Sequence, residues 1–116
     1  MATSRGRTTK KKVESYEVAM PLLNAIYDEF KAFSKKKPDG ALSKNKIAVV
    51  NRLLEKCRAV LQSEPSFEFL DLFDEDDLPQ NSDVVLMLSQ YVAAMQLFKE
   101  AYWRWDNLEW NWCVSD

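Results

Sequence analysis

Apolar residues recur along most of the chain at alternating steps of three and four, the spacing that places side chains on one face of an α-helix. The first such segment carries Val13, Tyr16, Met20, Leu23, Tyr27 and Phe30. Pro21 lies inside it and removes one backbone donor, so the helix either kinks there or divides into two pieces. The apolar stripe continues in register across the proline, which favours a single kinked helix.

Three further helical segments follow a polar turn over residues 35–40. Each opens with residues suited to a first helical turn: Ser43, then Pro65, then Ser82 with Asp83. The second helix is predicted to end near Gln62, the third is short, and the last reaches at least Tyr102. The pattern therefore predicts an all-α fold, a small bundle of three long amphipathic helices plus one short helix.

All four tryptophans lie within the C-terminal segment 102–113: Trp103, Trp105, Trp110 and Trp112. If residues 106–109 form a turn between two strands, the outer two tryptophans pair with each other, and so do the inner two. This spacing resembles the designed tryptophan-zipper hairpins, in which two Trp-x-Trp units flank a four-residue turn. The resemblance is confined to this segment, and it implies a local structure and not a function.

The turn of this predicted hairpin departs from the favoured pattern at Leu108. A two-residue turn favours Asn-Gly because both central residues take positive φ, and here leucine replaces the glycine. A four-residue loop built on a type I turn avoids this problem. The segment also fits a continuing helix, with its three-four steps at Phe98, Ala101, Trp105, Leu108 and Trp112. The sequence leaves hairpin and helix open.

Charge is divided between the two halves of the chain. Residues 1–62 carry 14 Lys and Arg against 6 Asp and Glu, whereas residues 63–116 carry 2 against 12. Residues 1–11 lack an apolar anchor and are predicted to be a disordered basic tail, which leaves one helical domain over residues 12–116. If the two halves pack side by side, their fields partly cancel. If the two halves remain separate, the tail and the Lys35–Lys46 loop have the charge to bind phosphates, and the acidic half has the charge to bind a basic protein.

The composition gives little support for catalysis or for a metal site. The chain has no histidine, and Cys57 and Cys113 show no metal-ligand or disulfide spacing. Its two glycines, Gly6 and Gly40, are too few for a phosphate-binding loop. Counted from Asp74, the acidic run lacks the glycine and the glutamate that an EF-hand loop requires. We therefore predict no enzyme activity, no cofactor and no metal.

The leading functional hypothesis is a non-catalytic helical protein–protein interaction module. Such a module is an adaptor, an inhibitor, or an accessory protein comparable in build to bacterial antitoxins and immunity proteins. The predicted partner-binding residues combine the tryptophans with the acidic loop: Trp103, Trp105, Trp110, Trp112, Asp74, Glu75, Asp76 and Asp77. The partner is another protein of unknown identity, or a second copy in a homodimer.

The alternative hypothesis is a small nucleic-acid-binding regulator. It uses the basic N-terminal tail and the Lys35–Lys46 loop to contact phosphates, although no recognised DNA-binding motif is present. No apolar run is long enough to cross a bilayer, and the N-terminus lacks the apolar stretch of a signal peptide. A cytoplasmic location without membrane association is therefore expected.

Overall fold

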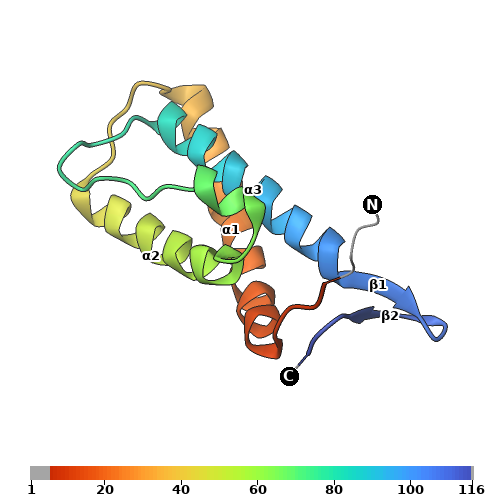
Figure 1. Cartoon of the computed structure of the whole chain (residues 1–116). Helices are drawn as coiled ribbons and strands as arrows, with labels where there is room; N and C mark the ends of the chain where they lie inside the picture. The colour runs from red at the N-terminus through yellow and green to blue at the C-terminus, as the bar shows by residue number, and fades with distance from the viewer. Residues whose placement is uncertain (1–5, 116) are drawn as a thin grey trace.

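The computed structural model describes residues 6–115, which fold around three long helices (Figure 1). The elements, in chain order, are α1 (Lys10–Lys36), α2 (Lys44–Leu61), the 3-10 helix η1 (Pro65–Phe69), α3 (Asn81–Tyr102), β1 (Trp103–Asp106) and β2 (Glu109–Trp112). The two strands form an antiparallel hairpin that projects from the C-terminal end of α3 (Figure 1). The prediction of a helical bundle with a Trp-rich C-terminal hairpin is therefore confirmed.

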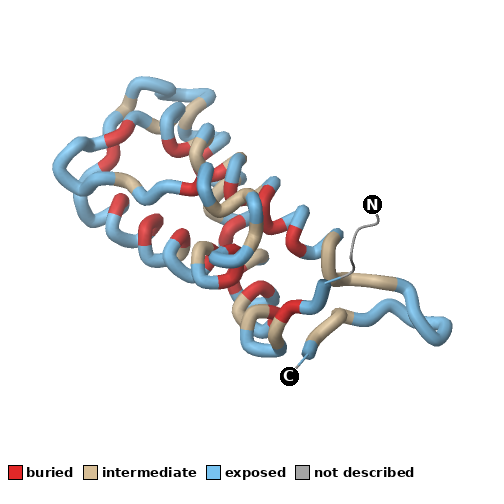
Figure 2. Tube along the Cα trace, in the orientation of Figure 1, coloured by how far each residue is buried: buried red, intermediate tan, exposed pale blue. Residues whose placement is uncertain are grey.

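The core lies where the three long helices face one another (Figure 2). Its fully buried side chains include Leu23 of α1, Ile47 and Leu54 of α2, and Leu88 and Met95 of α3. Burying each of these side chains stabilises the fold by about 1.5–3 kcal/mol relative to leaving it in water. The apolar stripes read from the three-four spacing are thus the faces that hold the bundle together.

Two of the helices begin at a hydroxyl cap, of which only the second was predicted from the sequence. The Thr9 hydroxyl accepts a hydrogen bond from the backbone N–H of Lys12 at 3.1 Å and begins α1. The Ser43 hydroxyl accepts from the backbone N–H of Lys46 at 3.2 Å and begins α2, as predicted. α1 continues through Pro21 as one helix, so the alternative of two separate pieces is wrong.

Two other predicted starts differ in detail. The short third helix is a 3-10 helix, and it begins at the predicted Pro65. α3 begins at Asn81, before the predicted Ser82, because the Asp83 carboxylate accepts a hydrogen bond from the backbone N–H of Gln80 at 3.0 Å. The carboxylate that the sequence indicated for the first turn of the helix therefore caps it by accepting from the residue before the helix.

The segment between η1 and α3 is held against the bundle by buried polar side chains. The Asn51 side-chain N–H donates to the carbonyl of Phe73 at 2.7 Å, and its oxygen accepts from the N–H of Phe73 at 2.9 Å. The Tyr91 hydroxyl donates to the carbonyl of Asp71 at 2.7 Å, and Arg58 donates to the carbonyl of Leu70. Irregular backbone is fixed in this way because its polar groups need partners when they are buried.

The N-terminal segment differs from the predicted disordered tail. Residues 1–5 lie outside the described residues, but Thr8 is buried, with 5% of its surface exposed. Its N–H donates to the carbonyl of Cys113 at 3.0 Å, and its carbonyl accepts from the N–H of Ser115 at 3.0 Å. The residues before α1 therefore pair with the chain just after β2. Sequence patterning missed this pairing because backbone hydrogen bonds need no apolar side chain.

Candidate functional site

The hairpin brings all four tryptophans together on one face. Trp103 pairs with Trp112 and Trp105 pairs with Trp110 in the strand register, as the hairpin interpretation predicted. The rings of Trp103 and Trp110 stack at 6.2 Å between centroids, and the other two contacts are edge-on, at 5.2 and 5.9 Å. The continuing-helix alternative is wrong, because the helix stops at Tyr102 and Trp103 takes an extended backbone conformation.

The base of the hairpin is anchored to the bundle. The Trp112 ring lies 5.3 Å from the ring of Tyr16 on α1 and 6.0 Å from that of Phe98 on α3. The backbone N–H of Cys113 donates to the carbonyl of Tyr102 at 2.7 Å, and Thr8 pairs with the segment beyond. The hairpin is therefore fixed at one end by aromatic packing and by backbone hydrogen bonds.

The tip of the hairpin is open to solvent. Trp105 and Trp110 are 58% and 54% exposed, and Leu108 in the turn is 87% exposed. We call these three residues the hairpin tip. The two tryptophan pairs thus divide their roles: Trp103 and Trp112 are half-buried against the bundle, and the other pair extends beyond it (Figure 2). The tip is an apolar patch on a rigid support, the kind of surface that marks an interaction site.

A recess lies beside the base of the hairpin, between α1 and α3. Its volume is about 440 Å³, and it is lined by Tyr16, Glu17, Met20, Pro21, Asn24, Lys99, Trp103 and Trp112. The Lys99 ammonium lies 5.2 Å from the centroid of the Trp103 ring, a cation–π contact. The recess continues the aromatic face of the hairpin onto the bundle. Sequence reasoning missed its α1 wall, because the residues concerned lie some eighty positions away from the tryptophans.

The turn itself is a two-residue turn with strained backbone. Asn107 and Leu108 have φ values of 52° and 68°, so both central residues lie in the left-handed region. The alternative of a four-residue loop built on a type I turn is therefore wrong. Asparagine tolerates this region, whereas leucine does so at a cost of about 1–2 kcal/mol. The Leu108 side chain at this strained position is exposed to solvent and makes no contribution to the core.

Replacing Leu108 with glycine is expected to stabilise the protein. Leu108→Gly removes the left-handed strain and loses no packing, and part of this gain is offset by the greater freedom of glycine in the unfolded chain. We expect the free energy of unfolding to rise by about 0.5–1 kcal/mol in a urea titration. Asn107→Gly is the matched control and should change stability less, because asparagine already tolerates the conformation. A loss of stability in Leu108→Gly contradicts the strained turn.

The acidic loop does not join the tryptophans. Asp74, Glu75, Asp76 and Asp77 are all exposed, and they precede the N-terminal end of α3, whereas the hairpin follows its C-terminal end (Figure 1). α3 spans about 33 Å at 1.5 Å per residue, in a molecule whose longest extent is 49 Å. The predicted partner-binding residues therefore fall on two separate surfaces.

The acidic loop instead faces the basic turn between α1 and α2. The Lys44 ammonium lies 3.4 Å from the carboxylate of Asp76, and both side chains are mostly exposed. Opposite charges thus meet at this end of the molecule and partly neutralise each other. The N-terminal basic residues lie at the other end of α1, about 39 Å from the Lys35–Lys46 loop at 1.5 Å per residue. The surface predicted for nucleic acid is therefore divided as well.

The remaining reactive groups lie outside both surfaces or are shielded. Cys57 is fully buried, and burial raises the pKa of its thiol to about 12, so it is not a nucleophile near neutral pH. Within residues 6–115, no three Asp, Glu or Cys side chains gather closely enough to hold a metal ion. In that same part of the chain, no helix combines the length and the apolar character that crossing a bilayer requires.

Searches of protein-family models, of curated proteins and of solved structures found no significant match to the chain. The functional argument therefore depends on the geometry of the hairpin and of the recess beside it.

Proposed function

We propose that this chain is a non-catalytic protein-binding module that docks its partner on the hairpin tip and the adjoining recess. The observation that carries the proposal is the unequal burial of the two tryptophan pairs. Trp105 and Trp110 are more than half exposed, although Trp112 anchors the same hairpin to the core and Trp103 is half-buried beside it. A pair of indoles that served stability alone would gain more by packing against the bundle, as the other pair does.

The geometry suits tight recognition because the exposed rings are already ordered. Trp110 stacks on Trp103 and contacts Trp105 edge-on, so little side-chain freedom remains to be lost on binding. Tryptophan is among the residues most enriched at interface hot spots, where a truncation typically weakens binding by 2 kcal/mol or more, about 30-fold. The recess provides a cavity beside the rings in which a partner's apolar side chain can be buried.

The charges around the tip indicate the chemistry of the partner. Asp106 and Glu109 are exposed on either side of the two-residue turn, and neither forms an ion pair within the described residues. A partner with an apolar centre and basic residues at its rim complements this arrangement. An adaptor or an inhibitor that covers such a surface on its target is the class of function that we propose.

The test compares proteins retained from host extract by the tagged chain and by two variants. We expect Trp105→Ala/Trp110→Ala to lose a partner that the wild type retains, with an affinity loss of about 30-fold or more once that partner is purified. Leu86→Ala/Leu97→Ala is the matched control, because both leucines are exposed on α3 and neither lines the recess, and it should retain the partner. If the tryptophan variant retains the same proteins with unchanged affinity, the proposal is wrong.

A salt titration separates this proposal from binding through phosphates. An aromatic interface should weaken only modestly between about 50 and 200 mM salt, whereas binding to nucleic acid through lysines should weaken by orders of magnitude. If binding persists in Trp105→Ala/Trp110→Ala and weakens steeply with salt, the basic segments bind the partner and the hairpin tip does not.

A further inference from the structure

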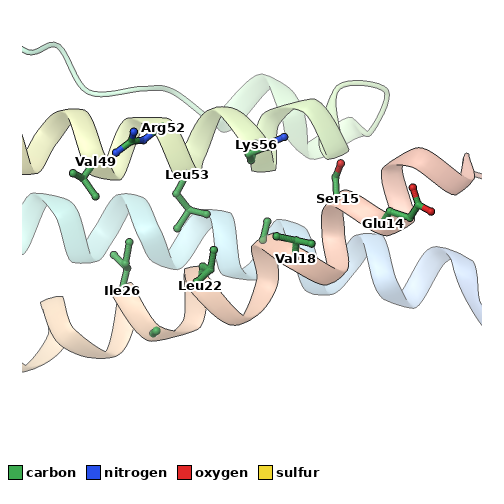
Figure 3. Close-up of a pocket in the computed structure, with 11 residues that line it drawn as sticks. Glu14, Ser15, Val18, Leu22, Ile26, Val49, Arg52, Leu53 and Lys56 are labelled. Atoms are coloured by element: carbon green, nitrogen blue, oxygen red, sulfur yellow. The ribbon is translucent and has the colours of Figure 1, made fainter.

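An open apolar groove runs along the seam between α1 and α2. One pocket of about 590 Å³ lies between Val18, Leu22 and Ile26 of α1 and Val49 and Leu53 of α2 (Figure 3). A second pocket of about 330 Å³ shares Ile26 and Val49 with the first and extends the groove toward the C-terminal end of α1. We call this continuous surface the α1/α2 seam. In Figure 3, α3 lies behind the two helices and leaves the seam uncovered.

The seam exposes large apolar side chains that the core does not use. Val18 is 67% exposed, Leu22 is 53% exposed and Val49 is 50% exposed. Val18, Leu22 and Ile26 follow each other at steps of four, which aligns them along one edge of α1. The core stripe of α1 lies on a different face, through Leu23 and its neighbours. α1 therefore carries a second apolar stripe, and contiguous surfaces of this kind mark interaction sites.

The two rims of the seam carry opposite charges. The α1 rim has Glu14 and Glu29, and the α2 rim has Lys46, Arg52 and Lys56. Glu14 and Lys56 line the same pocket at one end of the seam, and Glu29 and Lys46 line the other pocket. Within the described residues, no ion pair connects the rims across the groove. The seam thus presents an apolar floor between an acidic edge and a basic edge.

We propose that the α1/α2 seam binds the same seam of a second copy of this chain. A two-fold axis that runs along the seam keeps every residue at its own level and lays α1 of one copy over α2 of the other. The acidic rim of each copy then meets the basic rim of its partner, with Glu29 of each copy opposite Lys46 of the other. A two-fold axis across the seam would instead place α2 on α2, with basic rim against basic rim.

The size of the seam sets the strength that is expected. From Glu14 to Phe33 it follows about 28 Å of α1 at 1.5 Å per residue, and two helices side by side are about 20 Å wide. The footprint is then about 560 Å² per copy, or about 1,100 Å² in total, which is near the lower end for a specific interface. The dimer is therefore reversible and has to be sought over a range of concentrations.

Sedimentation equilibrium of the full chain tests the dimer directly. From about 1 to about 500 µM protein, the weight-average mass should rise from 13.5 kDa toward twice that value. Leu22→Lys places a charge in the middle of the seam and should weaken the dimer by tenfold or more, roughly 1.4 kcal/mol. Leu86→Lys, on the exposed face of α3, is the matched control and should leave the dimer unchanged. A monomeric wild type at every concentration overturns the proposal.

A charge exchange tests the geometry of the two-fold axis. At low salt, Glu29→Lys and Lys46→Glu should each weaken self-association roughly fivefold, because each homodimer then brings like charges together twice. An equimolar mixture of the two variants should associate as tightly as the wild type, because both contacts in the mixed dimer are again between opposite charges. If mixing restores nothing while Leu22→Lys still weakens association by tenfold or more, the proposed two-fold arrangement is wrong.

The hairpin variant distinguishes this dimer from association through the tryptophans. Trp105→Ala/Trp110→Ala should leave the mass at every concentration unchanged, because the hairpin tip does not line either pocket of the seam. If this variant abolishes the dimer and Leu22→Lys does not, self-association belongs to the hairpin, and the seam proposal is overturned.

Discussion

Raising the pH from about 9 to about 12 is expected to lower the free energy of unfolding by roughly 5 kcal/mol. Cys57 and Tyr91 are both fully buried. Burial raises the pKa of Cys57 from 9.0 to about 12 and that of Tyr91 from 10.0 to about 12. Below about pH 9 both groups are protonated in the folded and the unfolded state, and they contribute no pH dependence.

The direction follows from which state keeps the proton. Above about pH 9 for Cys57 and about pH 10 for Tyr91, the unfolded chain loses the proton while the folded protein retains it. Within that range each pH unit costs the folded state about 1.4 kcal/mol per group. A domain of this size has a total stability of only 5–15 kcal/mol. If the stability near neutral pH is about 5 kcal/mol, the protein should unfold by about pH 12. Circular dichroism in urea titrations at several pH values measures this loss.

Two variants identify the groups responsible. Tyr91→Phe leaves the carbonyl of Asp71 without its donor, so stability near neutral pH should fall by about 1–2 kcal/mol. Its alkaline loss should nevertheless be shallower, because one titrating group is gone. Cys57→Ala should shift the onset of the loss to higher pH for the same reason. Stability that stays constant up to about pH 11.5 in the wild type contradicts the burial of both groups.

The long helices could be predicted because apolar residues repeat at steps of three and four over several turns, a spacing that fits an amphipathic α-helix and no other regular structure. The steps through Ile47, Val50 and Leu54 recur over several turns, and all three side chains are buried. The ends of the elements depend on single contacts and were harder to predict from the sequence. The sequence indicated Ser82 as the cap of α3. The hydrogen bond from the backbone N–H of Gln80 to the Asp83 carboxylate instead starts the helix earlier in the chain, at Asn81. A single side-chain rotamer decides such a boundary, and periodicity does not report it.

The hairpin was one of two structures that the C-terminal pattern allowed. The tryptophan spacing fits a zipper, and it fits helical steps equally well, so the deciding information lies elsewhere. Trp112 packs on Tyr16, which is nearly a hundred residues away in the sequence. The turn closes with Leu108 in a conformation that local preference disfavours. Tertiary contacts thus override a local preference that indicated a different turn.

The predicted site combined two segments that the fold holds apart. The acidic loop and the tryptophans lie in the same half of the chain, but the intervening α3 separates them along its whole length. The contact between Lys44 and Asp76 connects residues far apart in sequence, and only the fold reveals it. By contrast, the seam had a signal in the sequence. Val18 and Leu22 are apolar residues outside the core stripe of their helix, and a second stripe indicates a second surface to be covered.

The two tryptophan pairs should lose very different amounts of stability on truncation, and this is the sharpest test of the site. Trp112→Ala removes the ring that contacts Tyr16, Phe98 and Trp103. Truncating a large aromatic residue in a packed position costs about 3 kcal/mol. Trp110→Ala removes a ring that is mostly exposed, and it should lower the free energy of unfolding by about 1 kcal/mol or less.

Urea titrations of the two variants measure the difference, and hydrogen exchange locates it. In Trp112→Ala the N–H of Cys113, which donates to the carbonyl of Tyr102, should exchange much faster, because the base of the hairpin has lost its anchor. Trp112→Phe is the matched control and should recover part of the stability, since a smaller ring still fills some of the same space. Equal losses of stability in Trp110→Ala and Trp112→Ala would contradict the division of the tryptophans into an anchoring pair and a docking pair, because the exposed rings would then be needed for folding itself.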